Sequence, residues 1–179
     1  MEIMPYRAEM LQQYAWLDRE PAPKMLRAAL DLYGVKETIG EKDNPVIMDW
    51  AAECGIRGYN HDAIAWCGLF IAVVAKRAGK PIPENPLWAR NWAQWGSDSP
   101  KELGAVLVFT RNGGGHVGLY VGEDSDCYHV LGGNQSDSVC IARLRKDRLI
   151  ACRAMYKIKP SNVRPVWLTG TGAVSNNEA

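Results

Sequence analysis

The spacing of apolar residues changes at Gly104, and this change restricts the folds open to the chain. Before Gly104, apolar residues recur at helical spacing. After it, short apolar stretches alternate as strands do and are separated by turn sequences such as 112–115, Asn-Gly-Gly-Gly. Helices first and closely spaced strands afterwards predict an α+β fold with an antiparallel sheet of about five strands.

Local start and stop signals place these elements along the chain. The segment 67–78 is apolar nearly all round and ends with Lys76, Arg77 and Gly79, so we expect it to be a buried central helix. The other expected helices cover 25–33, 46–53 and 86–95, the last with Trp88, Trp92 and Trp95 at helical spacing. The expected strands cover 105–110, 116–122, 126–131, 138–143 and 150–156.

The length of 179 residues and an apolar fraction of 47% suit one domain with a sizeable core. We expect that domain to span residues 24–159. Residues 1–23 are interpreted as an N-terminal extension with a short helix. Residues 160–179 are rich in Pro, Gly, Thr, Ser and Asn, and are expected to form a flexible C-terminal tail.

Charge and cysteine content narrow the function classes. Lys and Arg total 21 against 20 acidic residues, so the net charge of +1 argues against binding to nucleic acid or anionic lipid. No apolar run approaches a membrane span, and the N-terminus lacks the pattern of a signal peptide, so synthesis in the cytoplasm without membrane insertion is expected. The five cysteines cannot all pair and show no CxxC spacing, which leaves at least one free thiol.

Cys67 is the thiol best placed for chemistry, because it stands where the central helix is expected to begin. A helix N-terminus and a nearby imidazolium both lower the pKa of a thiol and favour the nucleophilic thiolate. His116 opens an expected strand, and alternation places it on one face with Gly118 and Tyr120, opposite an apolar face. Asn134 follows a neighbouring strand and can offer a side-chain oxygen to the second ring nitrogen of the histidine.

Stabilisation of an oxyanion completes this hypothesis. The backbone N–H of Cys67 is unpaired at a helix start and can bind the oxygen of a tetrahedral intermediate. A second donor is expected from the loop 59–62 or from Gln135, and both alternatives remain open.

Each of these residues also has a purely structural interpretation. A cysteine on a helix is often a small buried apolar group, and His116 and Asn134 both stand near turn sequences. Their order and context together favour a Cys-His-Asn hydrolase. Cys127 and His129 share one strand face, but two ligands without a third and fourth do not make a metal site, so we expect no metal and no cofactor.

Several segments resemble the CHAP and NlpC-type branch of papain-like cysteine peptidases and amidases, which cut peptidoglycan. The resemblance covers roughly residues 24 to 156. It is carried by 28–37 (AALDLYGVKE), Asn44-Pro45, Asp62 with Trp66-Cys67, 115–118 (GHVG) and 131–137 (LGGNQSD) leading to 141–143 (IAR). It implies a papain-like fold, with Cys67 as nucleophile at the start of a helix that packs on the sheet, His116 as base and Asn134 as third residue. Many CHAP domains carry Glu where this chain has Gly132.

The same resemblance implies the substrate class. An N-acetylmuramoyl-L-alanine amidase and a peptidoglycan endopeptidase, each forming a thioester with the substrate, both remain open. Aromatic and polar residues near the expected nucleophile are candidates to line the substrate groove: Tyr59, Asp62, Trp66, Trp88, Trp92 and Gln135. Asp62 can also be interpreted as a helix cap, and the tryptophans as core.

We therefore expect a monomeric phage endolysin or virion-associated lysin, with bacterial peptidoglycan as its partner. It would be made in the cytoplasm and act on the cell wall after release, with holin-assisted access. One alternative is a secreted antibacterial amidase effector, which would be blocked by an immunity protein. The other is a catalytically inactive module that binds the cell wall or serves as a structural part of a virion.

Overall fold

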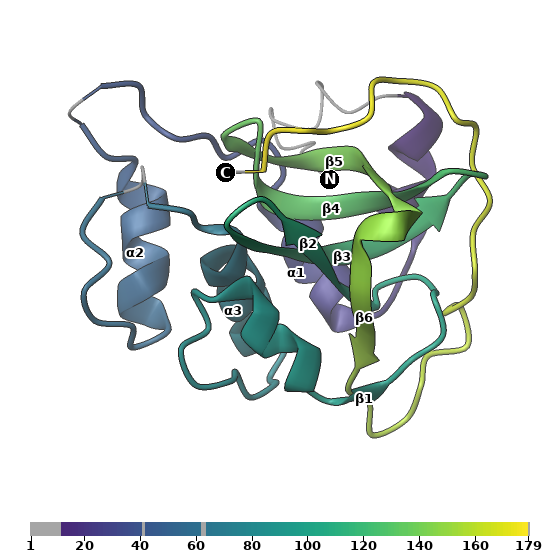
Figure 1. The fold of residues 1–179 in the computed structure, drawn as a ribbon. Coiled ribbons are helices and arrows are strands. Elements are labelled where there is room, and N and C mark those ends of the chain that lie inside the picture. Colours follow the sequence, from purple (N-terminus) through teal and green to yellow (C-terminus); the bar gives the residue numbers. More distant parts are fainter. Residues whose placement is uncertain (1–11, 41, 62–63, 179) are drawn as a thin grey trace.

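The computed structural model describes residues 12–40, 42–61 and 64–178, and shows an α+β fold (Figure 1). The first half is mainly helical and the second half forms the sheet, as the change at Gly104 predicts. The helices are α1 (Lys24–Asp31), α2 (Pro45–Glu53) and α3 (Cys67–Arg77), with the 3-10 helices η2 (Gln12–Arg19), η3 (Ala89–Gln94) and η4 (Lys146–Arg148).

The sheet is open and antiparallel, with six strands in the order β1-β6-β2-β3-β4-β5. Its strands are β1 (Ser97–Asp98), β2 (Val106–Arg111), β3 (Gly114–Glu123), β4 (Cys127–Gln135), β5 (Ser138–Arg145) and β6 (Leu149–Ala154). The last five correspond to the five strands expected from the sequence. β1 is not predictable from the sequence, because it consists of two exposed residues without an apolar pattern.

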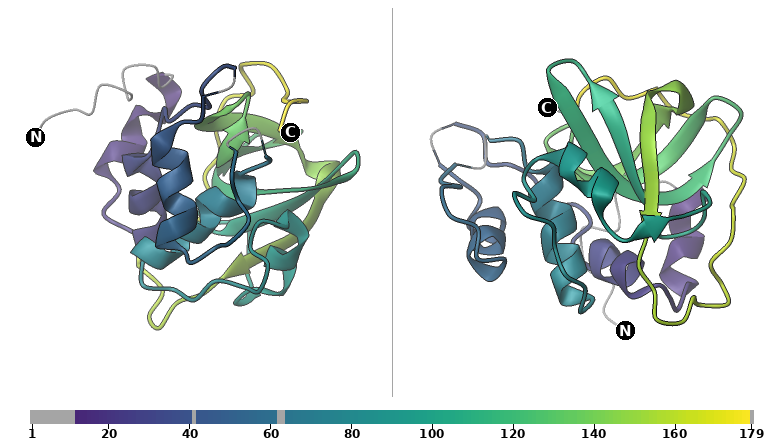
Figure 2. Two further views of the ribbon diagram at one scale, coloured as in Figure 1. Left: turned by 90° about the vertical axis from the view of Figure 1, so that its left-hand side faces the viewer. Right: turned by 60° about the horizontal axis from the view of Figure 1, so that its bottom comes forward.

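The helix α3 is the centre of the molecule. Every residue from Cys67 to Ala75 is buried, which confirms the expected central helix. It packs against β3 and β4, while α1 and α2 contact its other sides (Figures 1 and 2). This arrangement fixes the N-terminus of α3 beside the sheet, because a helix that is apolar all round has no face that water can occupy.

The two faces of the sheet carry separate apolar clusters. Val106, Val108, Val117 and Leu119 face the helices and join the main core. The opposite face carries a smaller cluster, built from residues that alternate with the first set: Ala105, Leu107, Phe109, Tyr120, Tyr128, Val130, Leu144 and Cys152. The β3 strand is therefore buried on both faces.

The two ends of the chain are more closely packed than the sequence suggests. Tyr14 and Leu17 on η2 are buried in the main core, so this part of the expected extension belongs to the domain; residues 1–11 lie outside the described part. The expected flexible tail has regular contacts with the sheet: Glu123 exchanges backbone hydrogen bonds with residues 166 and 168, and Ser175 N donates to Arg143 O. Because backbone hydrogen bonds do not depend on the type of side chain, the composition of this segment does not predict them.

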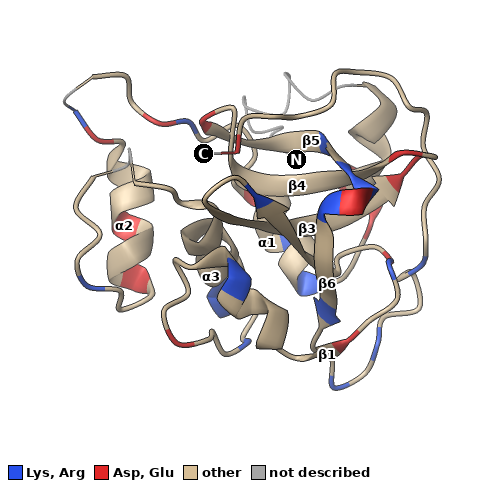
Figure 3. Ribbon diagram, viewed as in Figure 1, with Lys and Arg blue, Asp and Glu red and all other residues tan. Residues whose placement is uncertain are grey.

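Acidic and basic residues are dispersed over the structure (Figure 3). This agrees with the small net charge of +1. Within the described residues, no helix is both long enough and apolar enough to cross a membrane.

Candidate functional site

Cys67 is the first residue of α3, as the sequence predicts, and only 2% of its surface is exposed. The chain segment before η3 crosses directly over this first turn. A Cβ on Gly68 would overlap the carbonyl oxygen of Pro86, so the glycine allows the crossing. The first turn of α3 thus offers unpaired backbone N–H groups around a buried thiol.

His116 lies near the start of β3 and is completely buried. Its Nε2 lies 3.0 Å from Oε1 of Gln135. The two N–H groups of the Gln135 amide donate elsewhere, to the carbonyl oxygens of Val130 (3.0 Å) and Cys140 (2.7 Å). The atom of Gln135 that faces His116 is therefore an acceptor, and His116 Nε2 must carry the proton.

The other ring nitrogen follows from this assignment. In a neutral imidazole with its proton on Nε2, Nδ1 holds a free lone pair. Nδ1 of His116 is buried and has no hydrogen-bond partner in the described structure. Gln135 thus presents His116 as a base whose accepting nitrogen is unoccupied.

Gln135 occupies the position at His116 that the sequence analysis assigned to Asn134. The side-chain oxygen and nitrogen of Asn134 are buried and have no hydrogen-bond partner among the described residues. The pairing of β4 with β5 shifts by one residue between Gly132 and Gln135, and Asn134 has a φ of 57° within this β-bulge. The extra residue of a bulge breaks strict alternation, so Gln135 takes the strand face that Gly132 also occupies.

Gly132 makes room for the contact between His116 and Gln135. A Cβ added there would overlap Oε1 of Gln135 and would lie 3.4 Å from Nε2 of His116. Glycine at this position therefore has a steric reason in this chain. Any larger residue would displace the amide that orients the histidine.

Cys67 lies on the helical side of the sheet, whereas the His116 side chain is on the other side, where its ring centroid lies 6.5 Å from that of Phe109. Gly133 faces Trp66 and Phe70 on the helical side, whereas its neighbour Gly132 faces the His116 ring on the other side. The paired part of β3 and β4 begins only at Leu119, so the strands leave Val117 unpaired toward β4. There the backbone N–H of Val117 faces the Cys67 sulfur. No hydrogen bond joins Cys67 to His116 in the described structure, because Nδ1 is unpartnered and Nε2 contacts Gln135.

Burial favours the neutral forms of both groups. It raises the pKa of the Cys67 thiol, and the backbone N–H of Val117 and the charge of Arg111 oppose it only in part. Burial also lowers the pKa of His116 to about 4, against the hydrogen bond with Gln135 and the charge of Glu178, which raise it. The resting pair is therefore a thiol and a neutral imidazole, not the thiolate and imidazolium that the sequence analysis considered.

A pocket of about 300 Å³ opens onto Cys67. Its walls come from the segment that crosses α3 and from the hairpin between β2 and β3: Ala65, Leu87, Trp88, Ala89, Arg90, Arg111, Gly113, Gly114 and Gly115. A second pocket, of about 470 Å³, shares Leu87 and Trp88 with it. We call the two together the Trp88 groove. The sequence does not predict Arg90 and Arg111 as site residues, because they reach Cys67 only through the way the segment before α3, η3 and the β2–β3 hairpin pack together.

Most aromatic residues expected in a groove are instead part of the core. Trp66 is fully buried, packs beside Trp50 and donates from Nε1 to Glu37 Oε1 at 2.6 Å. Trp92 and Tyr59 are also buried. Trp88 is the exception, since 73% of its surface is exposed at the groove. Asp62 lies outside the described residues.

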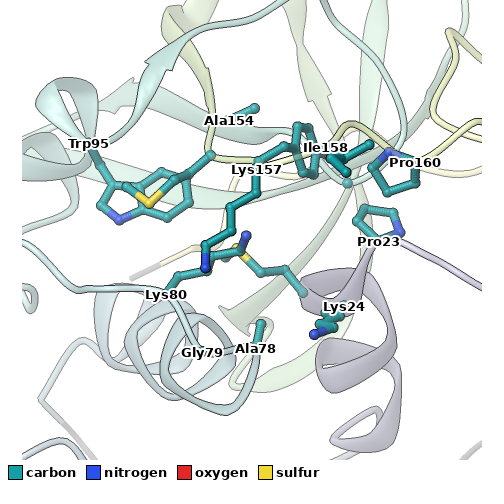
Figure 4. Close-up of a pocket in the computed structure, with 14 residues that line it drawn as sticks. Pro23, Lys24, Ala78, Gly79, Lys80, Trp95, Ala154, Lys157, Ile158 and Pro160 are labelled. Atoms are coloured by element: carbon teal, nitrogen blue, oxygen red, sulfur yellow. The ribbon is translucent and has the colours of Figure 1, made fainter.

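Another pocket, of about 320 Å³, contains none of the candidate catalytic side chains. It lies between the start of α1, the end of α3 and the chain after β6, where Lys24, Lys80 and Lys157 line it (Figure 4). Among the described residues no group of three or more side chains could hold a metal ion. His129 is engaged by Asp124 and Tyr14.

Comparisons with protein-family models, with curated proteins and with solved structures found no match.

Proposed function

We propose that the chain is a cysteine hydrolase that cleaves an amide bond in the peptide part of bacterial peptidoglycan. The observation that carries the hydrolase proposal is the orientation of His116: Gln135 fixes the proton on Nε2 and leaves Nδ1 as a free base. The next residue, Val117, directs its backbone N–H toward the Cys67 sulfur. The choice of peptidoglycan rests on the resemblance to CHAP and NlpC-type enzymes.

The chemistry follows from these positions. Nδ1 of His116 removes the proton of the Cys67 thiol as the sulfur attacks the carbonyl carbon, and Gln135 Oε1 stabilises the imidazolium that forms. The backbone N–H of Cys67 stabilises the oxyanion. His116 then returns the proton to the leaving amine, and a thioester remains. Water, deprotonated by His116, hydrolyses the thioester and restores the thiol.

A resting neutral pair suits this sequence of steps. Separated charges would be costly in the buried site before substrate arrives. Because the proton moves only during attack, charge develops next to groups that are already positioned for it: Gln135 Oε1 for the imidazolium and the N–H groups of α3 for the oxyanion.

Release of soluble peptide from purified peptidoglycan tests the proposal. We expect release by the wild type, and loss of release in Cys67→Ala. Cys152→Ala serves as a matched control, because Cys152 is a buried thiol on β6 that does not line the Trp88 groove. Equal release by the Cys67→Ala variant would remove the proposed nucleophile.

One observation favours the alternative of an inactive module: Cys67 and His116 are almost fully buried. A structural module would bind peptidoglycan without releasing any fragment. Mass spectrometry of the soluble fraction separates the two functions, and the new termini also distinguish an amidase from an endopeptidase.

A further inference from the structure

The described residues that line the Trp88 groove carry only one sign of charge. The charged ones are Arg57, Arg90 and Arg111, and no lysine or acidic residue is among them. The whole chain has nearly equal numbers of basic and acidic residues, with a net charge of +1, so this concentration of arginine is local. A groove lined by a single sign of charge attracts a ligand of the opposite sign.

Two of these guanidinium groups are held in place by the backbone of the hairpin between β2 and β3. Arg90 donates from Nε (3.2 Å) and Nη2 (3.0 Å) to Gly114 O. Arg111 donates from Nε to Gly115 O at 3.0 Å. Among the described residues, both terminal nitrogens of Arg111 and Nη1 of Arg90 therefore retain free donors. No carboxylate in the described part of the chain forms an ion pair with either arginine.

Such a pair of arginines suits an anion with two oxygens in one plane, and in a peptide that anion is a carboxylate. A guanidinium with two free terminal nitrogens binds the two oxygens of a carboxylate in a planar, bidentate arrangement. The glycines at 113–115 leave the wall beside Arg111 without side chains, so a ligand can reach the backbone there. Arg111 also lies close enough for its charge to act on both Cys67 and His116. A carboxylate bound to Arg111 would thus lie next to the reacting bond.

We propose that the Trp88 groove selects an acidic peptide, and that Arg111 and Arg90 bind a free carboxylate of that peptide near the scissile bond. This inference rests on the proposed hydrolase function. It specifies that the enzyme recognises its substrate by a free carboxylate. The D-glutamate of the peptidoglycan stem peptide is one residue with this chemistry. Its α-carboxyl group is free in some cell walls and amidated in others.

Binding to an inactive variant tests the inference separately from catalysis. The Cys67→Ala protein is titrated with N-acetylmuramoyl-pentapeptide in two forms, one with the D-glutamate α-carboxyl group free and one with a carboxamide there. We expect the free acid to bind about ten-fold more tightly, because charge-assisted hydrogen bonds to the arginines are lost in the amide. In Cys67→Ala proteins that also carry Arg111→Gln or Arg90→Gln, the preference should fall toward unity.

A third double variant, with Arg19→Gln, is the matched control, because Arg19 lies at the end of η2 and does not line the groove. It should keep the full preference, and thermal melting of each variant verifies folding. Equal affinity for the two peptides, binding of neither, or a preference that survives loss of both groove arginines would overturn the inference. Cleavage by the wild type is scored separately: a preference in binding without cleavage would contradict the hydrolase and leave the acidic-peptide site standing.

Discussion

Nε2 of His116 lies 3.0 Å from Oε1 of Gln135, and this contact determines which nitrogen of the histidine can act as a base. Because both amide N–H groups of Gln135 donate to backbone carbonyls, the oxygen cannot exchange places with the nitrogen without losing both hydrogen bonds. The strand backbone therefore sets the tautomer of His116 through one side chain.

Replacing Gln135 should damage catalysis far more than replacing its neighbour. We expect Gln135→Ala to lower kcat on peptidoglycan by about 100-fold, because His116 loses the acceptor that fixes its proton. Asn134→Gly keeps the backbone free to adopt positive φ while it removes the unpartnered amide, so it should leave kcat nearly unchanged. The reverse order of effects would restore Asn134 as the orienting residue.

Gly132→Ala tests the steric requirement behind the same contact. The added methyl group would overlap Gln135 Oε1, and we expect a loss in kcat of about ten-fold or more as the amide moves from His116. In the Gln135→Ala background the same change should cost little further activity, because the displaced group is already absent. Full, additive losses in the double variant would show that Gly132 acts through some other contact.

The reactivity of Cys67 should increase with pH. Burial raises the pKa of this thiol, and the pKa of His116 falls to about 4, so at neutral pH the free protein holds a thiol beside an uncharged imidazole. Only the thiolate is alkylated. The rate of iodoacetamide labelling at Cys67 should therefore rise about ten-fold per pH unit between about pH 5 and pH 8. Peptide mapping follows the reaction, with Cys54 as an internal comparison; fast labelling that does not change over this range would indicate a thiolate–imidazolium pair instead.

A separate buried network should affect stability without affecting the chemistry. Asp124 accepts hydrogen bonds from Arg143 (2.9 and 3.1 Å) and from His129 Nε2 (2.7 Å). Burial raises the pKa of this carboxyl group, but these bonds and the backbone N–H groups of residues 126 and 127 together hold it well below its ordinary value. Since the folded pKa lies below the unfolded one, the stabilisation is present at neutral pH and is lost as the pH falls below about 4.

Asp124→Asn should therefore lower the free energy of unfolding by about 3 kcal/mol at neutral pH, measured by urea denaturation. The difference between variant and wild type should shrink in acid, where the wild-type carboxyl group also becomes neutral. Since Asp124 does not line the Trp88 groove, kcat of the folded variant should match the wild type. A difference in stability that does not depend on pH would mean that the carboxylate charge is not what stabilises the fold.

Much of this fold is readable from the sequence, because the period of apolar residues reports burial directly. The central helix and five of the six strands follow from it, and so does the position of Cys67 at a helix start. Two features lack such a period. β1 is too short to show one, and the C-terminal segment is held by backbone hydrogen bonds to Glu123 and Arg143 that any residue could make.

The candidate site was harder to predict than the fold for a specific reason. A β-bulge at Asn134 moves Gln135, the last residue of β4, to the face that strict alternation assigns to Asn134, so Gln135 contacts His116 instead. The sequence 132–134, Gly-Gly-Asn, is a signal for such a bulge, because these residues tolerate positive φ. Trp66 shows that proximity in sequence is not enough to predict a site residue. It directly precedes Cys67, yet its side chain is fully buried in the core.

Detection of the acyl-enzyme tests the central claim most directly. The wild type is mixed with soluble N-acetylmuramoyl-pentapeptide, quenched in acid within its first turnovers and digested, and the peptide that contains Cys67 is weighed by mass spectrometry. We predict a mass increase that corresponds to the acyl part of the substrate, carried by Cys67 and discharged by hydroxylamine as a thioester is. If cleavage of the substrate proceeds without any adduct on Cys67, and continues in Cys67→Ala, the proposed mechanism is wrong.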